Sequence, residues 1–208
     1  MAGILQLFDE LKLKTQLAAP TGRAAKRLSE VTGREASTIH RLLEAQFDEQ
    51  TGAMAFYHDE DAPLSCDAMI VDETSMVDLP LMASLLKALK PGCRLLLVGD
   101  PDQLPPVGPG NVFSDLIRSG MVQTVRLTQI FRQAQKSLIV MNAHAVNQGE
   151  LPRLTATDRD FFFLRRRDPA AAVRTIQELC QTRLPKNMGI APADIQAVSY
   201  THLRAHET

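Results

Sequence analysis

Two apolar segments of this sequence end abruptly in side chains that could bind a metal ion and activate water. Residues 69–71 are followed by Asp72 and Glu73, and residues 94–98 lead into a loop that holds Gln103. Buried parallel strands deliver such side chains to the carboxyl edge of a sheet, where ligands bind in open α/β folds. A carboxylate there can hold Mg²⁺, its neighbour can deprotonate an attacking water, and a Gln can bridge that water and a phosphate. The three side chains therefore indicate a site that hydrolyses a nucleotide.

Each segment also has a purely structural interpretation. Asp72 and Glu73 could simply favour the start of a following helix, whose amino-terminal end attracts carboxylates. The loop around Gln103 could be a rigid surface loop, stiffened by its proline residues. The two strand ends are separated by a single expected helix, which fits adjacent strands of one sheet and favours the functional interpretation.

A third segment combines a strand end, a tight turn and a basic helix start. Residues 15–19 form the expected strand, Thr21 and Gly22 the turn, and Arg23 opens the helix. Helix amino-terminal amides and the Thr21 hydroxyl suit a backbone phosphate of a nucleic acid. An ordinary capped turn explains the same residues, and taken alone it is the better interpretation.

Charge is unevenly distributed along the chain, although the net charge is only −1. Residues 12–41 hold seven basic and two acidic side chains, whereas residues 44–78 hold ten acidic side chains and no Lys or Arg. The first segment could face phosphates and the second could not. A solvated helix face is the simpler explanation of the basic segment when it is considered alone.

Composition is ordinary for a soluble globular protein. The 208 residues are 45% apolar, enough for one domain or one domain and part of another. No apolar run approaches the roughly 20 residues that span a bilayer, and the amino-terminal residues lack the basic region of a signal peptide. Cys66, Cys93 and Cys180 follow no metal-binding spacing, so we expect small core residues in a reducing cytoplasm. The chain is therefore expected to be cytoplasmic, with no membrane segment.

Strands and helices alternate along the chain, which predicts a parallel α/β sheet. The rhythm weakens near residue 120, where we expect a boundary between two α/β units. The expected helices cover residues 3–13, 23–31, 39–45, 78–89, 111–119, 135–148 and 169–183, the strands 15–19, 68–72, 94–99, 122–127 and 161–165, and a hairpin residues 45–57.

Arg132 lies just after the first strand expected in the second unit. Its guanidinium could reach across a cleft between the units and stabilise charge on a γ-phosphate in the transition state. A solvated surface Arg is the better interpretation when this residue is considered alone.

Taken together, these segments resemble the RecD-like DNA helicases of superfamily 1, the branch that translocates 5′→3′. The resemblance runs in order from about residue 3 to residue 196. Residues 19–28 are similar to motif Ia, residues 38–43 to the short helix after it, residues 71–78 to motif II (Walker B), residues 98–110 to motif III and residues 127–133 to motif IV.

The resemblance implies a role for each candidate residue. Asp72 would help to hold Mg²⁺, Glu73 would activate water, and Gln103 would sense the γ-phosphate of ATP and couple it to DNA. Arg132 would act as an arginine finger from a second RecA-like domain. The residues implied near single-stranded DNA are Thr21, Arg23 and His40.

The implied fold is an incomplete RecA-like parallel sheet of the P-loop NTPase type. It covers residues 1–120, with a hairpin insertion near residues 45–58 where these helicases carry the pin that splits the duplex. Part of a second RecA-like domain would follow at residues 121–196, and residues 197–208 are expected to be a non-native tail. The family's Walker A loop, ending in Gly-Lys-Thr or Gly-Lys-Ser, would precede residue 1, and motifs V and VI would follow residue 196.

The expected activity of the parent protein is ATP-dependent 5′→3′ unwinding of duplex DNA in recombination and repair, with ATP and Mg²⁺ as cofactors. Its partners would be single-stranded and duplex DNA, together with recombination or repair subunits that the sequence does not identify. The 208 residues alone are not expected to hydrolyse ATP at a useful rate, because they lack the phosphate-binding loop. Two alternatives stay open: a relaxase-linked superfamily 1 helicase, and a degenerate ATPase domain that serves as a DNA-binding or scaffold piece.

Overall fold

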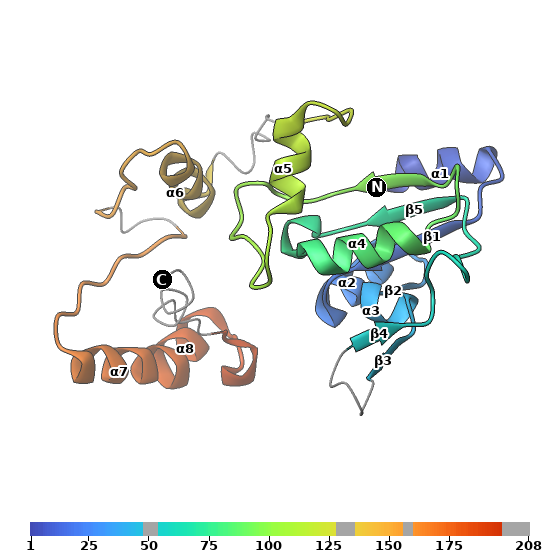
Figure 1. Ribbon diagram of the computed structural model, residues 1–208. Helices are drawn as coiled ribbons and strands as arrows, with labels where there is room; N and C mark the ends of the chain where they lie inside the picture. Colours follow the sequence, from blue (N-terminus) through green and yellow to red (C-terminus); the bar gives the residue numbers. More distant parts are fainter. Residues whose placement is uncertain (48–53, 128–135, 156–159, 197–208) are drawn as a thin grey trace. The chain divides into compact units, whose positions relative to one another are not determined.

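The computed structural model describes residues 1–47, 54–127, 136–155 and 160–196 (Figure 1). The chain divides into two compact units, Met1–Arg126 and Leu127–Thr208. The tip of the expected hairpin, Arg132 and the expected tail lie outside the described residues. No helix in the described ranges is long and apolar enough to cross a membrane.

A four-stranded sheet with the order β2-β1-β5-β6 forms the centre of the first unit. All neighbouring strands are parallel, which confirms the predicted α/β class with a parallel sheet. Every residue of β5 is buried, as expected for a strand covered on both faces. The strands are β1 (Thr15–Ala19), β2 (Ala36–Thr38), β5 (Ala68–Val71) and β6 (Arg94–Leu97).

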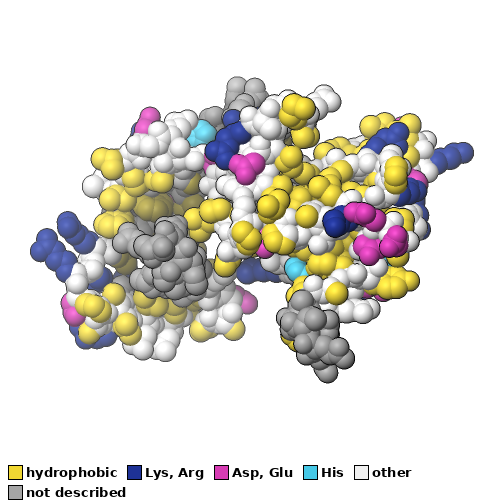
Figure 2. Space-filling view, viewed as in Figure 1, with side chains coloured by type: hydrophobic (Ala, Val, Ile, Leu, Met, Phe, Trp, Pro, Cys, Tyr) yellow, Lys and Arg dark blue, Asp and Glu magenta, His cyan; other side chains and the backbone are white. Residues whose placement is uncertain are grey.

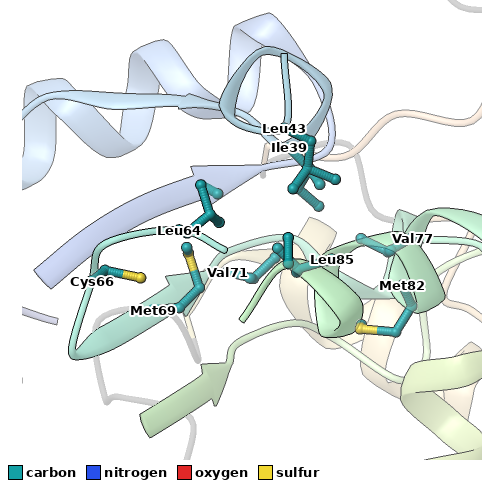
Figure 3. Packing of buried hydrophobic residues seen from close by; sticks show 11 residues of the cluster. Ile39, Leu43, Leu64, Cys66, Met69, Val71, Val77, Met82 and Leu85 are labelled. Carbon is teal, nitrogen blue, oxygen red and sulfur yellow. The ribbon is translucent and has the colours of Figure 1, made fainter. Parts of the chain in front are cut away.

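Alternate residues of β5 pack into two separate hydrophobic clusters on opposite faces of the sheet. Met69 and Val71 join the larger cluster, whereas Ile70 joins Leu5 and Leu28 in the smaller one. Figure 3 shows the larger cluster, in which the strand residues meet side chains of α3 and α4. The helices of this unit are α1 (Ala2–Glu10), α2 (Gly22–Thr32), α3 (Ile39–Leu42), α4 (Leu79–Ala88) and α5 (Val112–Ser119).

The structure differs from the sequence prediction in two places near α3. Strand β2 was not expected, because its Ala-Ser-Thr sequence has no apolar pattern; it forms by parallel pairing of Ala36 with Leu17 of β1 and of the residues that follow. Helix α3 ends at Leu42 rather than at residue 45, and Glu44 follows with a left-handed φ of 53°. This turn directs the chain into the next strand.

A small antiparallel ribbon follows α3. Strand β3 (Ala45–Phe47) pairs with β4 (Met54–Phe56), within the range where the sequence predicts a hairpin. The ribbon is attached to α3 because the Tyr57 and His58 amides donate to the Leu43 carbonyl over 3.1 and 3.2 Å. These two hydrogen bonds fix the ribbon at the end where β3 begins and β4 ends.

The described residues of the second unit contain helices and no strand. They form α6 (Leu138–Asn147), α7 (Pro169–Glu178), a π-helical turn (Leu179–Arg183), α8 (Leu184–Met188) and a 3₁₀ turn (Pro192–Asp194). The expected strand at 161–165 is wrong, and so is the one at 122–127 near the unit boundary, because neither segment pairs with another strand. The helix expected over 169–183 is interrupted by the π-helical turn, just before Pro185, which lacks an N–H donor.

An ion pair holds together the amino-terminal end of the sheet, opposite the edge that carries the candidate site. Asp67 accepts hydrogen bonds from Lys90 Nζ over 2.7 Å and from the Lys14 amide over 2.8 Å. The hydrogen bond from Lys90 lowers the pKa of Asp67, and the same bond raises the pKa of Lys90. The nearby Cys66 thiol is buried, and this burial raises its pKa to about 12.

We expect Lys90→Met to lower the free energy of unfolding at pH 7, by an amount that shrinks as the pH falls. Asp67 has a lowered pKa in the folded state, so its stabilisation is present above its unfolded pKa, about 4, and is lost as the pH falls through the folded value. Urea unfolding between pH 2.5 and pH 8 measures the difference. Lys87→Met is the matched control, because Lys87 lies 3.9 Å from Glu60 in an exposed pair. A constant Lys90→Met effect at all pH values would contradict the assignment.

Candidate functional site

The parallel sheet brings most of the predicted site residues to one edge. Thr21 follows the carboxyl end of β1, His40 follows that of β2, and Asp72 follows that of β5. The loop that holds Gln103 follows β6. Parallel strands share this edge, so four segments distant in sequence become neighbours there.

Asp72 and Glu73 lie in a tight turn directly after β5. The Asp72 amide donates to the Ala18 carbonyl over 2.9 Å, and Asp72 Oδ1 accepts the Glu73 amide over 3.0 Å. Glu73 has a left-handed backbone, with φ 51° and ψ 39°. This conformation costs a residue other than glycine about 1–2 kcal/mol, and such strain persists where the surrounding structure imposes it.

The residues after Glu73 hold that turn against the neighbouring strand. The Thr74 amide donates to the Val98 carbonyl over 2.9 Å, and Thr74 Oγ1 donates to the Val71 carbonyl over 2.9 Å. Thr74 and Ser75 are buried. The strand ends that carry Asp72 and the Gln103 loop are therefore fastened to each other through Thr74.

Gly99 allows this close approach. A β-carbon at position 99 would lie 3.0 Å from the Ser75 amide nitrogen and 3.2 Å from the Thr74 amide nitrogen. These atoms belong to the backbone and cannot move aside easily, so any larger residue would push the two strand ends apart. The sequence suggests a turn at Gly99, but only the structure shows the backbone that it contacts.

The loop of residues 100–110 is fixed at both ends. At its start the Gln103 amide donates to the Asp100 carbonyl over 3.2 Å, and Gln103 is exposed. At its end the Leu79 amide donates to the Pro109 carbonyl over 2.9 Å. Asp78, the amino-terminal cap of α4, lies against Gly108, where a β-carbon would overlap its carboxylate.

A cavity of about 280 Å³ lies beside the two candidate carboxylates. Arg27 contributes to it, and sequence reasoning missed this residue. The available signal was the helical spacing of Ala24, Arg27, Leu28 and Val31, which puts Arg27 on the same face of α2 as the buried Leu28. The lining residues are Met1, Ala24, Arg27, Leu28, Val31, Asp72 and Glu73.

The pair of carboxylates fits a magnesium ion that is shared with a nucleotide. Mg²⁺ usually takes one or two protein carboxylates and completes its shell with phosphate oxygens and water. Among the described residues no group of three or more His, Cys, Asp or Glu side chains could hold a metal by itself.

Thr21, Arg23 and His40, the residues predicted near DNA, have different local environments. Thr21 caps α2, its hydroxyl accepting the Ala24 amide over 3.3 Å, and Arg23 is exposed in the first turn. His40 is half-buried, with its ring 5.9 Å from that of Phe56 on the ribbon. Arg132 lies outside the described residues.

A parallel sheet that presents Asp72, Glu73 and the Gln103 loop at one edge is the arrangement of a nucleoside-triphosphate-binding domain. A family model described as "AAA domain" matches residues 1–109, more than half of the sequence. The chain belongs to the AAA domain family.

Several curated relatives are named as DNA helicases or as subunits of the RecBCD enzyme. The ATP-dependent RecD2 DNA helicase of Deinococcus radiodurans is 48% identical over 149 residues, which are 72% of this chain and 20% of the relative. The RecBCD enzyme subunit RecD of Mycobacterium tuberculosis is 36% identical over 193 residues, with 82% of this chain and 33% of the relative covered. The chain thus spans a third or less of these relatives, which confirm the predicted resemblance to RecD-like helicases.

Solved structures show a weaker likeness. Bacteroides Pif1 bound to single-stranded DNA is 18% identical, with a TM-score of 0.45 over 83% of this chain and 48% of that protein.

We expect Gly108→Ala to destabilise the first unit by about 1–3 kcal/mol, because the added methyl group overlaps the carboxylate that caps α4. Urea unfolding measures the loss, and limited proteolysis should show faster cleavage within residues 100–110. Gly3→Ala is the control, because a β-carbon at Gly3 meets no atom within 4 Å. Equal stability of the two variants would show that the loop is not held against Asp78.

Proposed function

We propose that this chain supplies the catalytic carboxylates and the coupling loop of an ATP-dependent 5′→3′ DNA helicase that acts in recombination and repair. The observation that carries the proposal is the fastening of the Asp72-Glu73 turn to the Gln103 loop through Thr74 and Gly99. In a site of this kind, the presence or absence of a γ-phosphate at the Asp72-Glu73 turn can change the position of the Gln103 loop. The names of the RecD2 and RecD relatives support the proposal.

Within this proposal each residue has a distinct task. Asp72 holds Mg²⁺ together with nucleotide phosphates, and Glu73 orients and deprotonates the attacking water. Gln103 contacts the γ-phosphate, for which its exposed amide has both a donor and an acceptor. Arg132 acts as an arginine finger of a second RecA-like domain, residues 121–196.

DNA is proposed to pass along the basic side of the same edge. Arg23 and the amino-terminal amides of α2 suit a backbone phosphate, with Thr21 fixing that turn. His40 joins this surface to the β3–β4 ribbon through Phe56, which supports a role for the ribbon at the point where duplex DNA separates. Recombination subunits are proposed as partners, because several relatives are named as RecBCD enzyme subunits. The RecD relatives are bacterial, which supports a bacterial cytoplasmic location.

Hydrolysis also needs a phosphate-binding loop, and the 208 residues contain no Gly-Lys-Thr or Gly-Lys-Ser segment. The activity is therefore proposed for a protein in which these residues are joined to such a loop. A chimera provides that context: the segment of the Deinococcus radiodurans relative that aligns with this chain is replaced by the residues of this chain.

In the chimera, Glu73→Gln should lower the DNA-stimulated rate of ATP hydrolysis by about 10²–10⁴-fold, because the water loses its general base. ATP binding should persist, since Asp72 is unchanged. A coupled phosphate-release assay measures the rate, and Glu60→Gln is the control at an exposed carboxylate. An active chimera in which Glu73→Gln has no effect would refute the catalytic role. An inactive chimera that still binds DNA would favour the degenerate DNA-binding alternative.

Gln103→Ala should uncouple DNA binding from hydrolysis. Because Gln103 is proposed to link the γ-phosphate to the DNA-bound state, the variant should retain its basal ATPase rate while single-stranded DNA no longer accelerates it. Titration of oligothymidylate into the ATPase assay measures this stimulation. Gln123→Ala, at another exposed Gln, should be stimulated normally. Normal stimulation of Gln103→Ala would remove Gln103 from the coupling role.

A further inference from the structure

Two cysteine thiols that are 27 residues apart in the sequence meet at the amino-terminal end of the parallel sheet. Cys66 lies just before β5, where it joins the larger hydrophobic cluster (Figure 3), and Cys93 directly precedes β6. Their sulfur atoms are 3.8 Å apart. The spacing in the sequence does not predict this pair, because the two thiols meet only when β5 and β6 align in parallel.

The backbone between the two thiols is held by the sheet. The Arg94 amide donates to the Asp67 carbonyl over 2.9 Å, and Ala68 pairs with Arg94 in the ladder of β5 and β6. A disulfide has an S–S distance of about 2.05 Å, so the two sulfurs must come about 1.8 Å closer to form one. Rotation of a cysteine side chain about its Cα–Cβ bond moves the sulfur by that much, so the strands can stay in register.

The two thiols differ in their access to solvent. Cys66 is fully buried, and this burial raises the pKa of its thiol to about 12, so the thiol stays protonated at neutral pH. Cys93 is only half-buried, so a small solute can reach its sulfur. Because the thiolate is the reactive form, an oxidant should react first with Cys93, and the Cys66 thiol should then react with the product.

Lys90 supplies a positive charge beside the pair of thiols. The hydrogen bond from its ammonium to Asp67, over 2.7 Å, is the main cause of the raised pKa of Lys90, and the charges of Cys66 and Cys93 add to it. The ammonium therefore offsets negative charge that develops on either sulfur. Figure 2 shows basic and acidic side chains together on the surface at the end of the first unit where β5 and β6 begin. A small polar oxidant thus meets a polar surface at this end of the sheet.

We propose that Cys66 and Cys93 are a redox modification site, at which a hydroperoxide converts the two thiols into a reversible disulfide. Two packed core thiols are the simpler explanation of the contact, but the partial exposure of Cys93 favours a reactive pair. In the cytoplasm proposed for this protein, disulfides are usually transient and redox-sensing. The site involves neither nucleotide nor DNA, so it goes beyond the proposed helicase function and can be tested without it.

The oxidation takes place in two balanced steps. The Cys93 thiolate attacks one oxygen of the hydroperoxide: an S–O bond forms, the O–O bond breaks, and the leaving oxygen takes a proton to become an alcohol or water. The Cys66 sulfur then attacks the sulfenic sulfur of Cys93. The S–S bond forms as the S–O bond breaks, and hydroxide leaves as water with the proton of Cys66. The two sulfurs together lose the two electrons that reduce the peroxide, and a cellular dithiol reverses the product by thiol–disulfide exchange.

The disulfide fixes a second end of the strand pair that carries the candidate site. It closes a loop over residues 66–93, which contains β5, the Asp72-Glu73 turn and α4. The other ends of β5 and β6 are already joined by the hydrogen bond from the Thr74 amide to the Val98 carbonyl. Because the cross-link also restricts the unfolded chain, the oxidised form is the more stable one.

The test uses the 208-residue chain with Cys180→Ser, in which Cys66 and Cys93 are the only thiols. The chain is treated with a few equivalents of hydrogen peroxide, blocked with N-ethylmaleimide and weighed intact by mass spectrometry. A monomer about 2 Da lighter, with no maleimide attached, is expected, because the disulfide has lost two hydrogens. Dithiothreitol should restore two maleimide adducts.

Tryptic peptides identify the bond. Residues 42–87 should be released joined to residues 88–94, because Pro91 blocks cleavage after Lys90. The same joined peptides from the wild-type chain decide the question without any substitution. The oxidised chain should also melt about 10 °C higher than the reduced chain.

Two further variants in the Cys180→Ser background separate the roles of the thiols. Cys93→Ser should oxidise at least about tenfold more slowly, because the remaining thiol is buried. Cys66→Ala should give a sulfenic acid at Cys93 that dimedone traps, since no second thiol can condense with it. Added oxygen without loss of two hydrogens in Cys180→Ser, a disulfide only between chains, or no oxidation would each overturn the proposal. Equal oxidation rates in Cys93→Ser and its parent would overturn it as well. None of these outcomes depends on ATP hydrolysis, so the two proposals fail separately.

Discussion

The hydrogen bond from the Thr74 amide to the Val98 carbonyl is the interaction on which the candidate site depends. It joins the end of β5 to the end of β6 beyond the last ladder pair, at the edge where ligands bind. Gly99 permits the approach because its missing side chain leaves room for the Ser75 and Thr74 amides. Without this contact, the Glu73 turn would lose the hydrogen bond that fixes it directly to the strand end before the Gln103 loop.

The rigidity of β5 lets the turn after it hold a strained residue. Each residue of β5 is buried, and its two faces pack into separate clusters, so the strand cannot shift without opening one of them. The Asp72 amide is tied to β1 and Thr74 to β6, which leaves Glu73 between two fixed points. Its left-handed backbone follows from these attachments, and strain imposed in this way is common where side chains must be aimed at a ligand.

The sequence predicts the parallel sheet and its acidic edge well, because β5 and β6 have continuous apolar runs that end in polar turns. Strand β2 escaped prediction since its Ala-Ser-Thr residues are ordered only by pairing with β1. Arg27 escaped because its place beside Asp72 depends on how α2 packs. The strands expected at 122–127 and 161–165 did not form, although their apolar content favours a strand. A strand forms only where a neighbouring strand accepts its backbone hydrogen bonds.

Charge separates the surface proposed for the nucleotide from the surface proposed for DNA. The carboxylates of Asp72 and Glu73 repel phosphates, so a nucleotide can approach them only when cations, such as Mg²⁺ and the neighbouring Arg27, offset that repulsion. A DNA backbone carries charge along its whole length and would avoid the same acids. The exposed basic residues at the start of α2 would offer it alternative contacts. In the proposed function, nucleotide and DNA would therefore bind at the same time, and a coupling element such as the Gln103 loop would then have two bound states to distinguish.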